Sequence, residues 1–196
     1  MQQSAVVFEV NPILDVQTIR DRARRHIQNG AVTPNYGVDV NVVLRLLNDA
    51  LATEIVSVLS YKRQYFVAKT SASANLVATL VEHATQDLLH VDRLAERIVQ
   101  LGGTPDFSPV GLPERSHAEY AEGNRLAEIV RDALVMERVA VESYREMVRY
   151  VGDGDPTTRR LLEDLLAVQE QHARNLLSLV EEVSLVEASR AVRSLT

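Results

Sequence analysis

Apolar residues recur at spacings of three and four along four long segments of the chain, which cover residues 39–69, 72–101, 124–151 and 156–183. This spacing is typical of an amphipathic α-helix, so each segment is predicted to form one helix of about 28–31 residues, roughly 42–46 Å long. Glycine and proline fall at the ends of the segments: Gly102 and Gly103 end the second, and Pro156 stands in the first turn of the fourth. The pattern predicts an all-α protein in which four helices share one core.

The connections between these segments predict how the helices pack. Short turns join the first segment to the second and the third to the fourth, so the helices of each pair are antiparallel, whereas about 20 residues separate the second from the third. A connection of that length can run along a bundle of about 40 Å, because an extended residue spans up to about 3.3 Å. The expected fold is a four-helix bundle with one long crossover between its second and third helices.

The ends of the chain lie outside this bundle. A short helix is predicted over residues 15–28, with Asp15 as its N-cap and Asn29 and Gly30 at its end. We divide the chain into an N-terminal extension with this helix, the bundle and a C-terminal tail, at residues 1–38, 39–184 and 185–196. The tail is expected to form a further short helix or a frayed end.

Polar side chains interrupt every apolar stripe close to its midpoint. They are Glu54 in the first segment, Asp87 and His90 in the second, Glu137 in the third, and Gln169 and His172 in the fourth. All lie about 16–19 residues, or roughly 25 Å of helix, from the short turn that joins their pair of helices. They are therefore expected at one level of the bundle, where burial is costly unless the groups are paired or bind a metal ion.

The spacing of these residues suits metal binding. Residues three apart share a helix face, so Asp87 with His90, and Gln169 with His172, can each offer two ligands to one ion. The di-iron carboxylate pattern has one glutamate from each of two helices and a Glu-x-x-His pair from each of the other two. The chain has no cysteine, and oxygen and nitrogen ligands suit Fe(II), Mn(II) or Zn(II). The alternative is a hydrogen-bonded polar core without metal, and His83, on the same face, is either a further ligand or a structural histidine.

Two stretches, residues 47–54 and 90–98, the second followed by Leu-Gly-Gly at 101–103, resemble the ferritin-like superfamily and within it bacterioferritin. The resemblance extends over about residues 40–183. It implies a ferroxidase centre, an enzymatic site in which Fe(II) is oxidised by oxygen or peroxide before storage. It also implies a ferritin-like bundle that belongs to a homo-oligomer.

The resemblance assigns roles to individual residues. Glu54 with His90 would hold one iron ion, and Glu137 with His172 the other. Tyr61, two turns after Glu54, matches a tyrosine beside the site and is the candidate catalytic side chain.

The chain departs from the family at two ligand positions. The family has glutamates that bridge the irons where this chain has Asp87, which is one methylene shorter, and Gln169, which is uncharged. We therefore expect weaker metal binding or a different metal, with Gln169 either a ligand or a hydrogen-bond partner of the ligands. Glu170 lies about 100° further round the helix and does not replace it. Leu88 stands where bacterioferritins have a haem-ligating methionine, so no haem is expected.

Charge and hydropathy restrict the possible partners. The net charge of −6 disfavours nucleic acid, although the arginine-rich stretch at 20–26 is either a solvated face or an anion-binding one. No apolar run approaches the ~18 residues of a membrane span, and the N-terminus lacks the basic region of a signal peptide. We expect a cytoplasmic protein whose partners are metal ions and further copies of the chain.

Four functions are compatible with these observations. The first is a ferroxidase and iron-storage subunit, and the second is a degenerate bundle that lost its metal and serves as a structural or interaction module. The third is a relative of the starvation-type DNA-protecting ferritins, and the fourth is another di-metal oxidase or peroxidase, because fold alone does not separate these chemistries.

Overall fold

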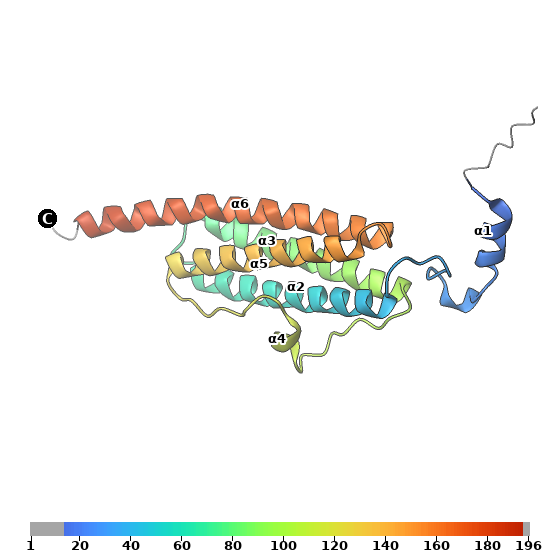
Figure 1. The fold of residues 1–196 in the computed structure, drawn as a ribbon. Helices are drawn as coiled ribbons and strands as arrows, with labels where there is room; N and C mark the ends of the chain where they lie inside the picture. Colours follow the sequence, from blue (N-terminus) through green and yellow to red (C-terminus); the bar gives the residue numbers. More distant parts are fainter. Residues whose placement is uncertain (1–13, 194–196) are drawn as a thin grey trace, which may run out of the picture.

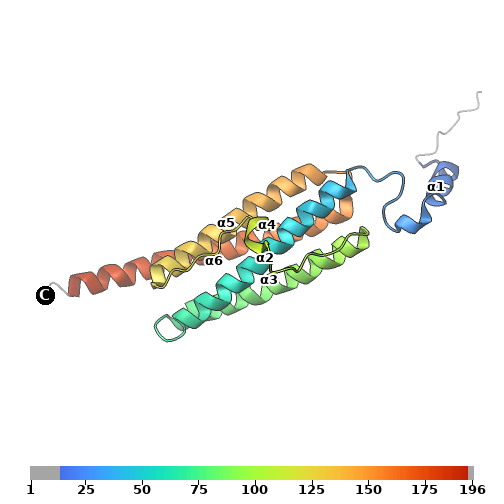
Figure 2. The same cartoon turned by 90° about the horizontal axis from the view of Figure 1, so that it is seen from below.

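The computed structural model describes residues 14–193, with side chains as far as residue 185. Four long helices lie along one axis (Figure 1): α2 (Val40–Ala68), α3 (Ala74–Gln100), α5 (Leu126–Val151) and α6 (Pro156–Arg193). α2 runs antiparallel to α3, α5 runs antiparallel to α6, and the two pairs pack on each other (Figure 2). The predicted all-α four-helix bundle, with its long crossover between α3 and α5, is confirmed.

Polar caps begin three of the long helices. The side chains of Asp39, Ser73 and Asp155 each accept a hydrogen bond from a backbone N–H in the first turn of α2, α3 and α6. These bonds satisfy donors that have no partner within the helix. α5 ends at Gly152, whose φ of +50° is a conformation that glycine adopts without strain.

Two apolar clusters fill the bundle, one on each side of a polar layer. The first includes Leu47, Leu51, Leu94, Ile98, Leu162 and Leu165, and the second includes Leu76, Leu80, Ile129 and Leu176. All of these side chains are buried, and burial of each stabilises the fold by about 1.5–3 kcal/mol. The two clusters hold the four helices together, so the layer between them can be polar.

The crossover runs along the outside of α2 from one end of the bundle to the other (Figure 1). It includes a helical turn that the sequence analysis did not predict, α4 (Leu112–Arg115). Leu112 is buried against Ala52 of α2, and the backbone N–H of His117 donates to the Thr53 hydroxyl at 2.9 Å. The turn forms because it places one apolar side chain on α2, a tertiary contact that the local sequence does not reveal.

The N-terminal helix is shorter than predicted. Asp15 caps it as expected, but α1 (Val16–Ala23) ends early and a 3₁₀ turn, η1 (Ile27–Asn29), follows it. His26 between them has a φ of +51°, which interrupts a continuous helix. α1 buries no residue and stands beyond the end of the bundle (Figures 1 and 2).

The segment after α1 joins the bundle through a close backbone contact. The N–H of Gly37 donates to the carbonyl of Gly154 at 3.1 Å, and a methyl group on Gly37 would lie only 2.7 Å from the Gly154 Cα. The Tyr36 hydroxyl donates to Asp155 at 2.6 Å. Both glycines are needed because any side chain would force the two loops apart.

The fourth bundle helix continues past residue 183, where the pattern predicted its end. α6 extends to Arg193, because the stretch after residue 183 contains neither glycine nor proline. Ser184 stays within the helix and donates to the carbonyl of Val180 at 2.7 Å. Part of the predicted tail is therefore helical, and residues 194–196 lie outside the described part of the chain.

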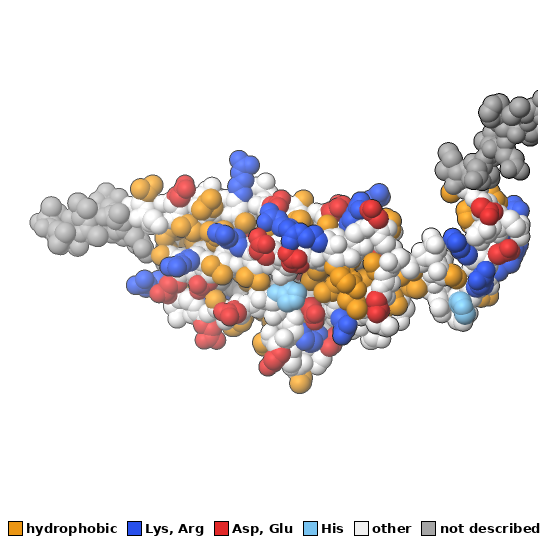
Figure 3. Space-filling view, viewed as in Figure 1, with side chains coloured by type: hydrophobic (Ala, Val, Ile, Leu, Met, Phe, Trp, Pro, Cys, Tyr) orange, Lys and Arg blue, Asp and Glu red, His pale blue; other side chains and the backbone are white. Residues whose placement is uncertain are grey.

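The described surface is mixed in charge and also exposes apolar side chains. Acidic and basic side chains are interspersed over the face of the bundle shown in Figure 3. Within residues 14–193, no helix combines the length and the apolar character that a membrane span requires.

Candidate metal centre

The six predicted ligand positions meet in the polar layer of the bundle. Each of the four helices crosses this layer at its midpoint, and each contributes at least one of the side chains. All six are at most 4% exposed: Glu54, Asp87, His90, Glu137, Gln169 and His172. The structure therefore brings the whole predicted set together away from solvent.

One half of the centre is formed by α2 and α3. Nδ1 of His90 lies 3.3 Å from Oε2 of Glu54 and 3.8 Å from Oδ1 of Asp87. Glu54, Asp87 and His90 each offer one ligand atom within 4.8 Å of the others. Two atoms bound to one ion at about 2.1 Å lie about 3.0–3.4 Å apart, so a small closure would fit these three around a cation.

The other half is formed by α5, α6 and a residue of α3. Nδ1 of His172 lies 3.1 Å from Oε1 of Glu137, and Nδ1 of His83 lies 3.7 Å from the same oxygen. The imidazole rings of His83 and His172 stack, with centroids 3.7 Å apart and planes 10° apart. His83, for which the sequence left two roles open, therefore lies inside the centre.

Asp87 lies between the two halves despite its short side chain. Its Oδ1 is 3.8 Å from Nδ1 of His90 and also 3.8 Å from Nδ1 of His172. Its Oδ2 is buried and has no hydrogen-bond partner within the described part of the chain. A buried carboxylate oxygen without a donor is costly, and a cation on either side would satisfy it.

Gln169 faces the carboxylates with its amide nitrogen. Nε2 donates to Oε1 of Glu54 at 2.9 Å and to Oδ1 of Asp87 at 3.4 Å. Its Oε1 is buried without a partner among the side chains described. In this orientation the amide supports the carboxylates by hydrogen bonding, as one of the two predicted roles requires.

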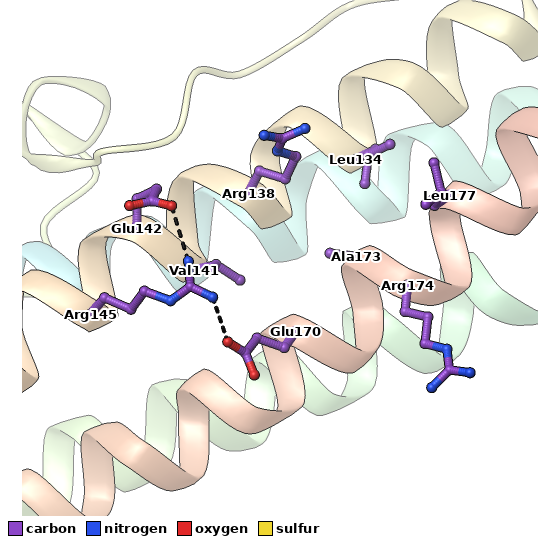
Figure 4. Close-up of a pocket in the computed structure, with 9 residues that line it drawn as sticks. All are labelled: Leu134, Arg138, Val141, Glu142, Arg145, Glu170, Ala173, Arg174 and Leu177. Atoms are coloured by element: carbon purple, nitrogen blue, oxygen red, sulfur yellow. Dashed lines mark hydrogen bonds and ion pairs between the residues drawn. The ribbon is translucent and has the colours of Figure 1, made fainter.

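The neighbouring Glu170 does not replace Gln169. It points into a groove between α5 and α6, where its carboxylate pairs with Arg145 at 2.7 Å (Figure 4). Arg145 also pairs with Glu142 of α5 at 3.1 Å. The carboxylate is thus held outside the bundle, as its position round the helix predicted.

Two tyrosines connect the halves. Tyr61 of α2 donates to Glu137 of α5, and Tyr144 of α5 donates to Glu54 of α2. Each tyrosine stands seven residues after the glutamate of its own helix and contacts the glutamate of the other. The sequence analysis singled out only Tyr61, although the equal spacing was a signal for Tyr144.

A further contact that the sequence analysis missed orients His172. Nε2–H of His172 donates to Oε1 of Gln86 on α3. Its Nδ1 is therefore the unprotonated nitrogen, directed at Oε1 of Glu137. Nδ1 of His172 and Oε1 of Glu137 are thus two acceptors that face each other, and a proton or a cation between them stabilises this arrangement. The hydrogen bond from Nε2 to Gln86 is also usual for a metal-bound histidine, which donates its other ring N–H to a neighbour.

Burial shifts the ionisation of these groups. It raises the pKa of Asp87 well above its usual range, with the charges of Glu54 and Glu137 adding to the effect. The pKa of Glu137 is also raised by burial, and the proximity of His172 opposes this shift. Burial, with the nearby His172, lowers the pKa of His83 to about 3, so this ring is neutral at pH 7. The carboxyls thus favour protons or other cations, and His83 has a free nitrogen lone pair.

The fold and this layer together define a class: a four-helix bundle with carboxylates and histidines buried at its midpoint. Residues 44–186 match the ferritin family, described as a ferritin-like domain. The chain belongs to the ferritin family.

Its relatives include two bacterioferritins. The one from Brucella melitensis biotype 1 is 30% identical over 132 residues, which is 66% of this chain and 77% of that protein. The one from Desulfovibrio desulfuricans is 25% identical over 131 residues, which is 66% of this chain and 69% of that protein.

Two solved structures share the fold. The dodecameric thioferritin, a bacterioferritin-related protein from Bacteroides fragilis, matches with a TM-score of 0.73 at 24% identity, covering 78% of this chain and 92% of that one. Dps from Thermosynechococcus elongatus matches with a TM-score of 0.66 at 19% identity, covering 71% and 90%.

Proposed function

We propose that this protein binds two Fe(II) ions in its buried centre and oxidises them, for iron storage or detoxification. The observation that supports the proposal best is the position of Asp87, whose Oδ1 lies 3.8 Å from a histidine of each half. Two adjacent ions can therefore share this carboxylate. Membership of the ferritin family supports iron as the metal, and Mn(II) or Zn(II) would suit the same ligands.

A pair of ions suits the chemistry of iron oxidation. Two Fe(II) ions give up two electrons, and one O₂ takes these with two protons to form H₂O₂ and leave two Fe(III) ions; where peroxide is the oxidant, H₂O₂ takes the electrons and protons and forms water. The product ions carry more charge than the substrate ions. Glu54, Asp87 and Glu137 favour the product because three buried carboxylates stabilise the higher charge.

The tyrosines are proposed to position the carboxylates. Tyr61 holds Glu137 and Tyr144 holds Glu54, so each glutamate keeps its orientation when an ion enters or leaves. Their hydroxyls are buried, and burial raises the pKa of both above the usual range. They therefore act as neutral donors at physiological pH.

The protein is also proposed to form a homo-oligomer. The Bacteroides fragilis relative is dodecameric, and α1 of this chain has no buried residue and exposes apolar side chains: Val16 and Ile19 are 52% and 45% exposed. Light scattering after size exclusion would measure the number of subunits, and a monomer at micromolar concentration would contradict the proposal.

Anaerobic titration with Fe(II), followed by oxygen, tests the iron chemistry. We expect saturable binding of two ions per chain and then the absorbance of ferric iron. Glu137→Gln should weaken binding, whereas Glu142→Gln, an exposed change on the same helix, is the matched control. Absence of saturable binding would contradict the proposal.

That negative result would favour the second function, a bundle that has lost its metal. One observation supports this alternative: the Gln169 amide already donates to both Glu54 and Asp87. A metal-free bundle would keep its melting temperature after chelation, and an iron-binding one would not.

A further inference from the structure

We infer that His83 is a metal ligand, and that with Glu137 and His172 it forms a two-histidine, one-carboxylate site for a divalent cation. The inference rests on the proposed metal binding and adds a ligand from α3 to it. The second half of the centre would then differ in chemistry from the half formed by Glu54, Asp87 and His90.

The ligand atoms of His83, Glu137 and His172 lie close enough together to bind one cation. The Nδ1 atoms of His83 and His172 lie 3.7 Å and 3.1 Å from the same oxygen, Oε1 of Glu137. The three residues offer ligand atoms within 4.8 Å of one another, and all are buried. A bound ion draws such atoms to about 3.0–3.4 Å apart, which His172 and Glu137 already satisfy. His83 would have to approach Glu137 and tilt out of its stack on His172, because the lone pair of an imidazole lies in the plane of the ring.

The contacts that His83 makes without an ion leave it under-satisfied. Its ring is 1% exposed, and its Nε2 has no hydrogen-bond partner in the region described. Its Nδ1 lies 3.2 Å from the hydroxyl of Tyr61, whose proton already goes to Glu137. Nδ1 is therefore the protonated nitrogen of the ion-free ring. Binding an ion through Nδ1 requires this proton to shift to Nε2, which has no acceptor among the described side chains.

His83 also compensates for Gln169. With an amide at that position, the second half retains Glu137 and a share of Asp87 as its only carboxylates. The neutral imidazole of His83 replaces the missing oxygen ligand with nitrogen. A site with two histidines and one carboxylate binds Fe(II) and also favours Co(II) and Zn(II), whereas the carboxylate-rich half suits Mn(II) better. The two halves should therefore bind ions with different affinities.

Titration of the full-length protein with Co(II) tests this inference, with heat and visible absorbance as readouts. The wild type should bind two Co(II) ions in separable steps. His83→Ala and His83→Gln should each weaken one step at least tenfold and leave the other unchanged. His117→Ala, which removes an exposed histidine of the crossover, is the matched control and should bind like the wild type.

Tyr61→Phe separates ligation from support. Because Tyr61 also holds Glu137, the comparison uses His83→Gln added to Tyr61→Phe. Ligation by His83 predicts a further loss of at least tenfold, whereas no further loss would show that His83 only holds Tyr61 and would overturn the inference. Unchanged two-step binding in both His83 variants would overturn the inference and leave the proposed function standing. A wild type that binds no Co(II) and no Fe(II) would overturn both.

Proton NMR of the Co(II)-loaded wild type gives the same answer without a variant. A histidine bound through one nitrogen keeps its N–H on the other, and Co(II) shifts that proton far outside the normal range. Ligation by His83, His90 and His172 predicts three such exchangeable signals, and two would contradict the inference.

Discussion

Gln169→Glu should raise the metal affinity of the centre and lower the free energy of unfolding of the ion-free protein. The amide nitrogen of Gln169 lies 2.9 Å from Oε1 of Glu54 and 3.4 Å from Oδ1 of Asp87. A carboxylate in its place replaces two hydrogen bonds with two repulsive contacts. The same carboxylate oxygen can reach a cation that either neighbour binds.

The size of the effect follows from these distances. Two full charges 2.9 Å apart repel by about 6 kcal/mol at an effective dielectric constant of about 20. This is an upper limit, because one carboxyl can take up a proton instead. We expect the ion-free variant to lose about 2 kcal/mol of stability, which lowers its melting temperature by roughly 4–8 °C. With metal bound, the extra charge should tighten binding at least tenfold, or about 1.4 kcal/mol.

Thermal melts and Mn(II) or Co(II) titrations of the same preparation measure both effects. Gln171→Glu is the matched control because it adds the same charge to the exposed side of α6. It should change neither stability nor affinity by more than a few tenths of a kcal/mol. If Gln169→Glu destabilised the ion-free protein without tightening metal binding, the placement of the ions beside Gln169 would be refuted.

Three further predictions follow from the contacts. Burial raises the pKa values of the Asp87 and Glu137 carboxyls, so the folded ion-free protein holds protons that the unfolded chain loses above about pH 4. Its free energy of unfolding should therefore fall as pH rises. Metal binding should release these protons, and melting temperatures measured with and without metal should diverge from about pH 5 to 7.5. Tyr61→Phe and Tyr144→Phe should each cost about 1 kcal/mol in urea denaturation and slow Fe(II) oxidation in stopped-flow absorbance, and unchanged oxidation rates would show that the tyrosines do not position the carboxylates. Asp155→Ala removes the partner of buried Arg97 at 2.8 Å and should cost about 3–5 kcal/mol in urea denaturation, whereas Asp153→Ala, in the same loop and 97% exposed, should cost little.

The level of the centre could be predicted because it depends on counting. Each helix rises 1.5 Å per residue, so residues at equal distances from two short turns must lie at equal heights. This rule predicted one common height for Glu54, Asp87 and Glu137, and the structure places all three in one buried layer. The burial of the layer followed too, because each residue interrupts an apolar stripe.

The contacts within the layer could not be predicted in the same way. Whether Gln169 presents nitrogen or oxygen depends on which neighbours are within about 3 Å, and that is set by how far apart the helices pack and how each is rotated. His83 shows the same limit: its face of α3 was known from its spacing, but its stacking on His172 depends on the distance between α3 and α6. The break at His26 and the turn at α4 depend on single backbone angles and tertiary contacts, which an apolar periodicity does not encode.

The departures from the family ligand set act together. Gln169 removes one negative charge from the middle of the centre, and the amide stabilises Glu54 and Asp87 when no ion is present. The shorter Asp87 still reaches both halves, and the inferred ligation by His83 would add a neutral ligand where a carboxylate is missing. Fewer buried charges make the ion-free bundle more stable, and neutral ligands keep a cation site without restoring those charges. The centre is thus arranged to stay folded without an ion, which is compatible with the proposed function because iron would then enter a preformed site.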